Sequence, residues 1–427
     1  MTLLSILVGI GGGVGAVLFH WLIRGFTLLL FGTASAATFL EGVTSFPWYY
    51  RIAIPAFGGL LVGLILTHKV VNEAHGDGVP EVMEAVALKR GNIRPWIAPV
   101  KALVSAISIG SGGAGGREGP IIQIGSALGS TVGQVMKLDP ERTKTLLAAG
   151  AAAGIAGAFN APLAGIVFSW EILLRKMSPA RLWLIIAAAV TGKIVANIII
   201  GLPRPLFDIP GGLSMHYTAI PLYVGLGIVA AGIALLFTNS LYWFEGMFER
   251  MRVLEMLKPA LGGLLLGVLA LVVPQVHEPS AFLVMTDTLY ATLPVAVVIG
   301  LLFAKIVAVS LTLGSGGSGG IFAPSLFIGA MAGSAYGKIM AGVLPGIADN
   351  SSLYAVIGMA AVFAGATHAP LTAIVILFEL TGAVPLIIPL IIVCSVSVFI
   401  AKRLQRKSIY TGELVKRGVD IKAQHLP

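Results

Sequence analysis

Apolar runs close to twenty residues long recur along the chain, for example at 184–202, 222–237 and 260–273. A helix needs about 20 apolar residues to cross the hydrocarbon core of a bilayer. Only 11% of the 427 residues are charged and the mean hydropathy is +0.94, whereas roughly a quarter of the residues of a soluble protein are charged. The sequence therefore predicts an all-α polytopic membrane protein with no aqueous catalytic domain.

The formal net charge of +9 has its clearest source near the C-terminus. Residues 402–422 contain seven Lys and Arg but only two acidic residues. Because Lys and Arg accumulate in cytoplasmic segments of membrane proteins, we expect a cytoplasmic C-terminus in a plasma or inner membrane, not a nucleic-acid-binding surface. The apolar N-terminal run is glycine-rich and lacks a clear cleavage site, which indicates a first membrane helix. The single cysteine, Cys394, excludes an internal disulfide and a thiolate metal cluster, and no cofactor is expected.

Two ordered matches show that the chain is duplicated. SGGAGGREGP at 111–120 matches SGGSGGIFAP at 315–324, and APLAGIVFSWE at 161–171 matches APLTAIVILFE at 369–379. Two matches at nearly one offset predict two related halves, 1–201 and 217–404, joined by a Pro- and Gly-rich linker at 202–216 and followed by a C-terminal helix and tail at 405–427. Many transporters are built from such repeats, often inverted across the membrane, and their sites lie near the bilayer midplane where broken helices meet.

Each glycine run ends in a proline and is followed by a segment with the composition of a helix. The same holds for GDGVP at 76–80. Proline suits the first turn of a helix, and a helix start offers unpaired amide hydrogens and a partial positive charge to an anion. A lone run of this type more often reflects close helix packing, but three such starts, two of them related by the repeat, favour an anion site. A phosphate-binding loop is excluded because no run ends in Gly-Lys-Ser/Thr.

The order GDGVP, GREGP, GGIFAP and a late Tyr410 resembles the CLC family of chloride channels and proton-coupled anion transporters. The resemblance covers essentially the whole chain, without the family's large C-terminal regulatory domains. It implies a homodimer with a separate anion pathway in each subunit. Further matching segments are PVK at 99–101, FNAPLAGI at 159–166 and APLTAIVILFELTG at 369–382.

The resemblance implies roles for individual residues. Glu118 becomes the gating glutamate, whose carboxylate occupies an anion position when ionised and leaves it when protonated. A carboxylate inside a membrane is costly and indicates function. The amides of Ile321 and Phe322, at the start of the helix after the third glycine motif, become anion donors. Tyr410 supplies a hydroxyl, although considered alone it would be interpreted as an interfacial tyrosine. Arg117 either shapes the local field or forms a structural ion pair. The expected anion-binding residues are Asp77, Gly78, Arg117, Gly119, Ile321, Phe322 and Tyr410.

Two positions depart from the family's pattern. Asp77 stands where a small hydroxyl residue is usual, and an ionised carboxylate accepts hydrogen bonds but cannot donate them to chloride. It could turn away, be protonated when an anion is present, or belong to the cytoplasmic vestibule. Ile172 stands where proton-coupled members often carry an inner glutamate, and the neighbouring Glu171 is read as structural. The usual inner proton relay is therefore missing, although Asp77 could replace it.

These observations predict a Glu118-gated chloride transporter that exchanges chloride for protons, with a passive chloride channel as the alternative. A fluoride-exporting branch is disfavoured because its asparagine-bearing first motif is absent. A remote alternative is an intramembrane enzyme, for which the sequence lacks a recognisable constellation such as HExxH.

Overall fold

The computed structural model describes residues 1–33, 35–67, 76–176, 178–201, 206–207, 217–290, 292–347 and 350–419. Over these residues the regular structure is helical, apart from two isolated β-bridges. Eight of the described helical stretches are long and apolar enough to cross a bilayer, including Pro179–Ile200, Ile220–Arg250 and Glu255–Val272, which overlap the three apolar runs named above. The predicted all-α polytopic fold is confirmed.

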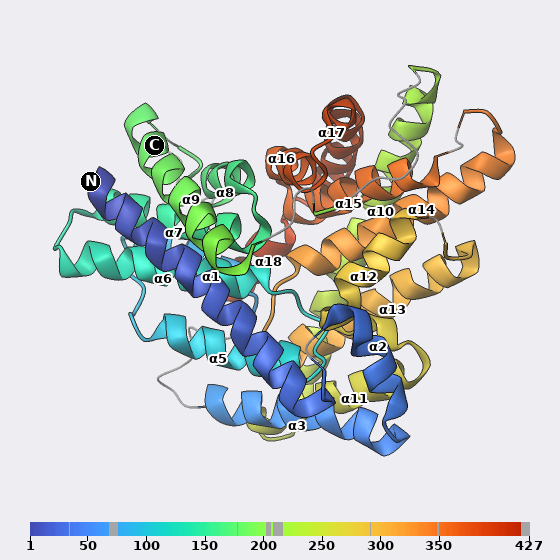
Figure 1. Ribbon diagram of the computed structural model, residues 1–427, viewed down its shortest axis with the longest axis horizontal. Coiled ribbons are helices and arrows are strands. Elements are labelled where there is room, and N and C mark those ends of the chain that lie inside the picture. The colour runs from blue at the N-terminus through green and yellow to red at the C-terminus, as the bar shows by residue number, and fades with distance from the viewer. Residues whose placement is uncertain are drawn as a thin grey trace.

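The first half of the chain forms the left and lower parts of Figure 1. Proline occupies an N-terminal position in α4, α7, α8 and α9, as expected from its missing amide hydrogen. A π-helical turn, η2 (Ser169–Leu174), extends α8. The helices are α1 (Thr2–Phe31), α2 (Ala36–Ser45), α3 (Trp48–Leu66), α4 (Val79–Ala87), α5 (Ile97–Gly110), α6 (Glu118–Val135), α7 (Pro140–Phe159), α8 (Pro162–Phe168) and α9 (Pro179–Ile200).

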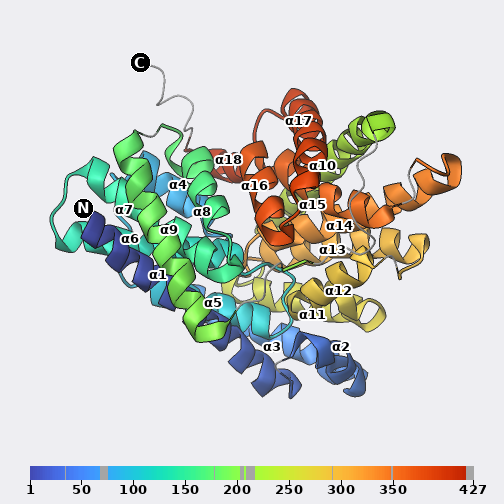
Figure 2. The ribbon, with the colours of Figure 1, turned by 45° about the horizontal axis from the view of Figure 1, so that its top comes forward.

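The second half follows a similar order and lies mainly on the right of Figure 1. The short α18 returns between the two halves, as the view turned by 45° also shows (Figure 2). The helices are α10 (Ile220–Arg250), α11 (Lys258–Val272), α12 (Glu278–Leu289), α13 (Val295–Gly314), α14 (Phe322–Val343), α15 (Ser351–Thr367), α16 (Pro370–Thr381), α17 (Ile387–Leu404) and α18 (Ile409–Lys416).

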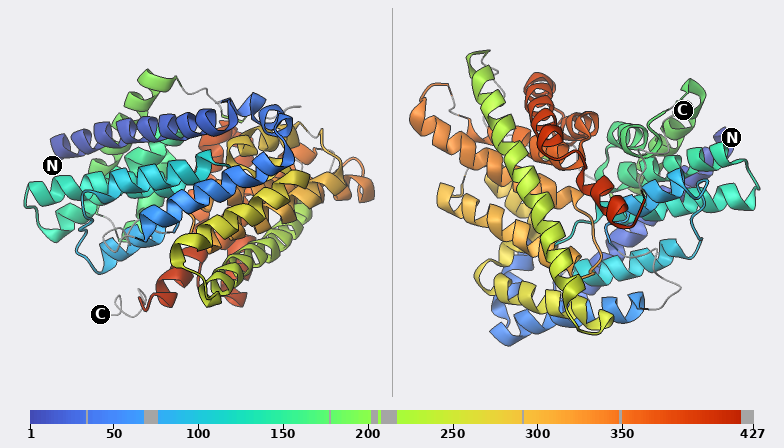
Figure 3. Two further views of the ribbon diagram at one scale, coloured as in Figure 1. Left: turned by 90° about the horizontal axis from the view of Figure 1, so that it is seen from below. Right: turned by 180° about the vertical axis from the view of Figure 1, so that it is seen from behind.

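Helix packing follows the duplication. In the first half α6 packs on α7 and α1 on α9, and in the second half α14 packs on α15 and α10 on α17. The halves meet through α3 against α11, at the bottom of Figure 1 and side by side in the left view of Figure 3, and through α8 against α16. Repeat-equivalent Gly116 and Gly320 form an antiparallel bridge. An antiparallel pair of equivalent residues is what a two-fold axis between inverted repeats produces.

Two carboxylates link the halves reciprocally. Glu171, at the end of the first APL segment, accepts hydrogen bonds from the amides of Leu371 at 3.1 Å and Thr372 at 2.7 Å, at the start of α16. Glu379 does the same for Leu163 at 3.1 Å and Ala164 at 2.7 Å, at the start of α8. Each carboxylate satisfies helix-start amides that have no partner within their own helix. The structural interpretation of Glu171 agrees with this contact.

A sharp reversal of the chain precedes each APL segment. Asn160 and His368 each end the preceding helix in the left-handed region, with φ of 58° and 60°. The following Ala161 and Ala369 carry the N-cap positions of α8 and α16. The chain must reverse between two helices there, and a left-handed C-cap produces that reversal. The expected linker at 202–216 lies outside the described residues except for Leu206 and Phe207, whose amides donate to the carbonyl of Leu380.

Candidate anion-binding site

The three glycine-rich motifs meet in the structure. Gly76 of the first motif bridges to Ser318 of the third, and Gly116 of the second bridges to Gly320. The amides and carbonyls of Gly116 and Gly320 exchange hydrogen bonds of 2.7 and 2.6 Å. The starts of α4, α6 and α14 therefore converge, as the sequence predicted for helix starts that share one site.

The start of α14 holds two carboxylates, one from each of the other motifs. The amide of Ile321 donates to Asp77 Oδ2 at 2.7 Å, and the amide of Ala323 donates to Glu118 Oε2 at 3.1 Å. Both acids are buried, with 5% and 2% of their surfaces exposed. Between these donors lies Phe322, the first residue of α14, whose amide has no acceptor within the helix. The α14 start thus presents the amides by which a helix terminus can hold an anion, and two carboxylates of the chain itself accept hydrogen bonds from them.

Glycines make room for this arrangement. Gly78 has a φ of +103°, and a Cβ there would lie 2.8 Å from the carbonyl oxygen of Gly119. A Cβ on Gly116 would overlap the carboxylate of Glu118. The glycines of the two motifs therefore allow α4 to approach α6 and allow the Glu118 side chain to fold back against its own loop.

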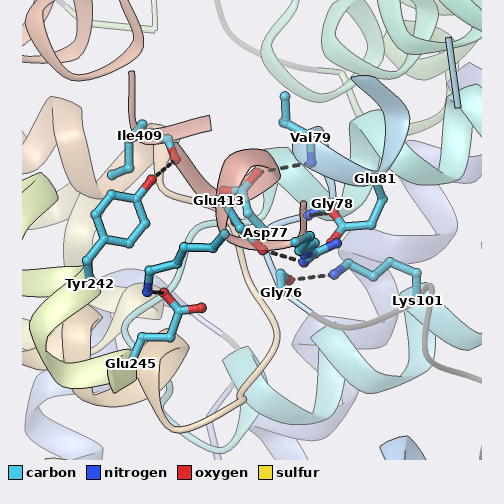
Figure 4. Close-up of polar contacts among 12 residues, drawn as sticks. Gly76, Asp77, Gly78, Val79, Glu81, Lys101, Tyr242, Glu245, Ile409 and Glu413 are labelled. Atoms are coloured by element: carbon cyan, nitrogen blue, oxygen red, sulfur yellow. Dashed lines mark hydrogen bonds and ion pairs between the residues drawn. The ribbon is translucent and has the colours of Figure 1, made fainter. Parts of the chain in front are cut away.

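Asp77 is held in place by its own loop as well as by α14. Its Oδ1 accepts a hydrogen bond from the amide of Val79 at 3.1 Å, and the amide of Gly78 donates to Glu81 Oε2 at 2.9 Å (Figure 4). From the other side, Lys101 Nζ donates to the carbonyl of Gly76 at 2.6 Å (Figure 4). The Asp77 carboxylate thus faces the α14 start. This excludes the first of the three alternatives considered for it, in which the side chain turns away.

Tyr410 lies on α18 beside the same site. It is 2% exposed, and its hydroxyl is buried without a hydrogen-bond partner in the described part of the chain. The residue borders two cavities, one shared with Asp77 and Ile321 and the other with Ile172. A buried hydroxyl normally has a hydrogen-bond partner, and this distinguishes Tyr410 from the other polar residues around the α14 start.

The cavity shared by Tyr410, Asp77 and Ile321 has a volume of about 240 Å³ and is rich in acids. Its wall includes Glu245, Glu249, Glu255 and Glu413, against Lys258 and Arg417. Several of these charges are paired. Arg417 contacts both Glu81, at 2.7 Å, and Glu413, while Lys258 contacts Glu255 at 2.7 Å. Figure 4 shows Glu413 beside Asp77, and Glu245 below Tyr242.

The second cavity has a volume of about 600 Å³, and its charged lining residues are mainly basic. Arg175, Lys402 and Arg406 line it, with Glu171 as its one acidic lining residue among those described. Ile172 occupies the position at which proton-coupled family members often carry an inner glutamate. It borders this cavity and is 6% exposed. An apolar side chain there cannot carry a proton.

Three of the expected anion-binding residues make other contacts. Arg117 Nε lies 3.4 Å from Glu278 Oε1, and its Nη1 lies 3.5 Å from His20 Nδ1. The ion-pair alternative for Arg117 is the one that matches the geometry. The Gly78 amide already donates to Glu81, and Gly119 contributes close packing against Asp77. The hydrogen-bond donors that remain at the site are therefore the amides at the start of α14 and the hydroxyl of Tyr410.

Sequence reasoning missed several polar residues around the site: Glu81, Lys101, Glu413 and Arg417. Lys101 did leave a signal, because Lys305 stands at the same offset of 204 that relates Gly116 to Gly320. Both lysines are completely buried, and Lys305 Nζ donates to the carbonyl of Val276 at 2.8 Å, just before α12. Paired lysines in otherwise apolar helices could have indicated a repeated structural role.

Comparison with known proteins agrees with this architecture. Residues 58–402 match the family described as voltage gated chloride channel. The chain belongs to that family. It is 33% identical over 428 residues to a ClcB-like protein of Ralstonia nicotianae, with 98% of each chain covered. It is also 33% identical over 368 residues to the H(+)/Cl(−) exchange transporter ClcA of Salmonella agona, covering 83% of this chain and 76% of that one.

Solved structures give the same result. A slow cyanobacterial Cl−/H+ antiporter superposes with a TM-score of 0.87 at 25% identity, with 97% of both chains covered. A eukaryotic CLC transporter shares the fold, with a TM-score of 0.79 at 23% identity over 97% of this chain and 74% of that one. The resemblance inferred from the motifs is confirmed: this member of the chloride channel family is a membrane transport protein and not an enzyme.

Proposed function

We propose that this family member exchanges chloride for protons and that Glu118 is its gate. The observation that carries the proposal is the contact between Glu118 Oε2 and the Ala323 amide, 3.1 Å apart at the start of α14. An ionised carboxylate held there competes with a mobile anion for the same helix terminus. Protonation removes the charge and weakens the hydrogen bond, because charge-assisted hydrogen bonds are roughly twice as strong as neutral ones.

The same geometry suits passage of an anion. Helix-start amides and a tyrosine hydroxyl attract chloride through partial charges, so the ion can enter and also leave. The Arg117 cation is engaged by Glu278 and does not provide a full charge at this point. We further propose a homodimer in a plasma or inner membrane, with α18 on the cytoplasmic side, where the basic segment 402–417 would follow the positive-inside rule.

Several relatives support exchange, since the Salmonella protein is named as a proton–chloride exchange transporter and the cyanobacterial structure as an antiporter. One observation favours a passive channel instead. Ile172 provides no titratable group at the position where proton-coupled members often have one. The two functions differ in whether chloride movement drives protons.

The test uses purified protein in liposomes, with voltage clamped and internal chloride and external pH recorded together. Glu118→Gln removes the titratable carboxylate while keeping its size. We expect the variant to keep chloride flux, to lose proton movement and to lose the part of the pH response that comes from Glu118. Glu41→Gln, an exposed acid in α2, is the matched control and should behave like the unmodified protein. Proton coupling that persists in Glu118→Gln would refute the proposed gate.

A further inference from the structure

Asp77 makes the same type of contact as the proposed gate, but with a different amide of the α14 start. Its carboxylate accepts the Ile321 amide at 2.7 Å, two residues before the Ala323 amide that donates to Glu118. The two acids come from different motifs, and both are nearly inaccessible to solvent. Every anion that approaches the α14 start therefore meets two tethered competitors.

The two carboxylates differ in the charged groups that surround them. Behind Glu118 are Arg117, Glu278 and the buried Lys305. Asp77, in contrast, borders the 240 Å³ cavity, which contains four glutamates but only two cations among its described lining residues. A cleft lined mainly by one sign of charge concentrates counter-ions. The cavity consequently favours cations such as protons at Asp77 and opposes anion entry while its acids are ionised.

We propose that Asp77 is a second, inner gate: ionised, it closes the α14 start by holding the Ile321 amide, and a proton taken from the acid-lined cavity releases that amide to chloride. The inference rests on the proposed role of the α14 start as the anion site. It also gives the chain an inner titratable group in place of the one that Ile172 lacks. In this step the O–H bond of a hydronium ion or a protonated glutamic acid in the cavity breaks, and one O–H bond forms on a carboxylate oxygen of Asp77.

The groups that face Asp77 are compatible with gain and loss of a proton. Glu81 of α4 and Glu413 of α18 oppose its negative charge, while Lys101 of α5 attracts it. The Tyr410 hydroxyl also faces the charge and has no partner in the described structure. Farther along the cavity, Arg417 neutralises part of the Glu81 and Glu413 charge, and Glu245 is paired with Lys416 at 2.8 Å.

Tyr410 is the observation that points to a ligand beside Asp77. Its fully buried hydroxyl can donate, yet it makes no hydrogen bond to the carboxylate or to another described group. A chloride ion that displaced Asp77 from the Ile321 amide would lie in the cavity corner that Tyr410 and Ile321 both line. The released amide and the hydroxyl would then donate to the same ion.

The experiment measures chloride binding by isothermal titration calorimetry in detergent at a series of pH values. Glu118→Gln is the background, because its neutral amide removes the titration of the outer gate. We expect chloride affinity in this background to rise as pH falls, by up to tenfold per pH unit for one linked proton. Adding Asp77→Asn should flatten the pH response and leave binding at least as tight as at the acidic limit.

Control variants separate this role from structural damage. Glu41→Gln replaces an exposed acid of α2 that does not line this cavity, and it should leave the pH response of the Glu118→Gln background intact. Asp77→Ser tests the position with a small hydroxyl and should also give pH-independent binding. Gel filtration verifies that each variant is folded.

The outcomes distinguish the inference from the proposed function. Absence of chloride binding in every folded variant would overturn both. Chloride binding that is independent of pH in Glu118→Gln would overturn the inner gate alone, as would a pH response that survives Asp77→Asn. If Asp77→Asn does not fold, the pH response of Glu118→Gln and its loss in Asp77→Ser decide the question.

Discussion

Asp77 and Ile321 belong to opposite halves of the chain, and the carboxylate of the first accepts the amide of the second at 2.7 Å. The contact ties the first glycine-rich motif to the third. It also gives Asp77, whose ionised carboxylate cannot donate a hydrogen bond to chloride, a defined position on the proposed chloride pathway. Together with the Glu118–Ala323 contact, it makes the start of α14 the centre of the proposed transport mechanism.

Chloride flux should increase as pH falls. A proton on Glu118 removes the charge that holds the Ala323 amide, so the anion competes for the α14 start more successfully. The sign is therefore acid activation, up to about tenfold per pH unit where one proton limits the rate. Chloride efflux from liposomes at stepped external pH measures it, and faster flux in alkali would contradict the gate.

Tyr410→Phe should weaken chloride binding by several-fold. The variant removes a hydrogen bond that is worth about 0.5–1.5 kcal/mol, while the ring keeps its packing. Tyr354→Phe is the matched control, since the Tyr354 hydroxyl is also buried without a described partner but does not line the 240 Å³ cavity. Calorimetric titration with chloride distinguishes the two, and equal affinities in both variants would remove Tyr410 from the anion site.

Glu171→Gln should lower stability without changing the ratio of chloride to protons. The carboxylate accepts the amides of Leu371 and Thr372 and the Thr372 hydroxyl, and Gln retains only one acceptor oxygen. A loss of about 1–2 kcal/mol follows from the cost of a weakened helix cap. Thermal unfolding followed by tryptophan fluorescence measures the loss. A changed transport ratio in the folded variant would instead assign Glu171 to the proton route.

Gly78→Ala should destabilise the protein by roughly 1–3 kcal/mol, because a non-glycine residue is strained at positive φ and its Cβ would lie 2.8 Å from the Gly119 carbonyl oxygen. Gly246→Ala in α10 is the control. Its Cβ would meet no atom within 4 Å, so Ala should be neutral or slightly stabilising there. Similar unfolding temperatures for the two variants would show that the close approach of α4 to α6 is not needed.

Ile172→Glu should restore coupling to a protein that has lost its inner carboxylate. Position 172 borders the 600 Å³ cavity beside Arg175, so an added carboxylate has nearby cations and room. In the Asp77→Asn background, we expect Ile172→Glu to recover proton movement with chloride, measured in liposomes. Ile172→Gln is the size-matched control and should not recover it. Recovery by both variants would argue against a titratable group as the cause.

The sequence predicted the helix starts accurately, because glycine and proline determine backbone conformation locally. Pro80, Pro120 and Pro324 each lie within the first turn of a helix, as expected. Long apolar runs likewise predicted the spanning helices. The duplication showed which segments are equivalent, and the antiparallel bridge between Gly116 and Gly320 is consistent with inverted repeats.

The contacts of individual side chains were harder to predict, for a physical reason. Whether Asp77 faces α14 depends on the positive φ of Gly78 and on a chain segment 244 residues away. Likewise, Arg417 contacts Glu81, which lies 336 residues earlier in the chain. Such contacts arise from tertiary packing, which no local pattern encodes. Arg117 illustrates this limit, because its partner Glu278 lies in the other half of the chain.

The most direct test of the central claim is whether chloride can drive protons against their own gradient. Liposomes containing the purified protein would be given a chloride gradient at clamped voltage, with external pH recorded. We predict proton movement uphill, opposite to chloride, that disappears in Glu118→Gln while chloride flux continues. Chloride flux without any linked proton movement in the unmodified protein would contradict exchange and identify a passive channel.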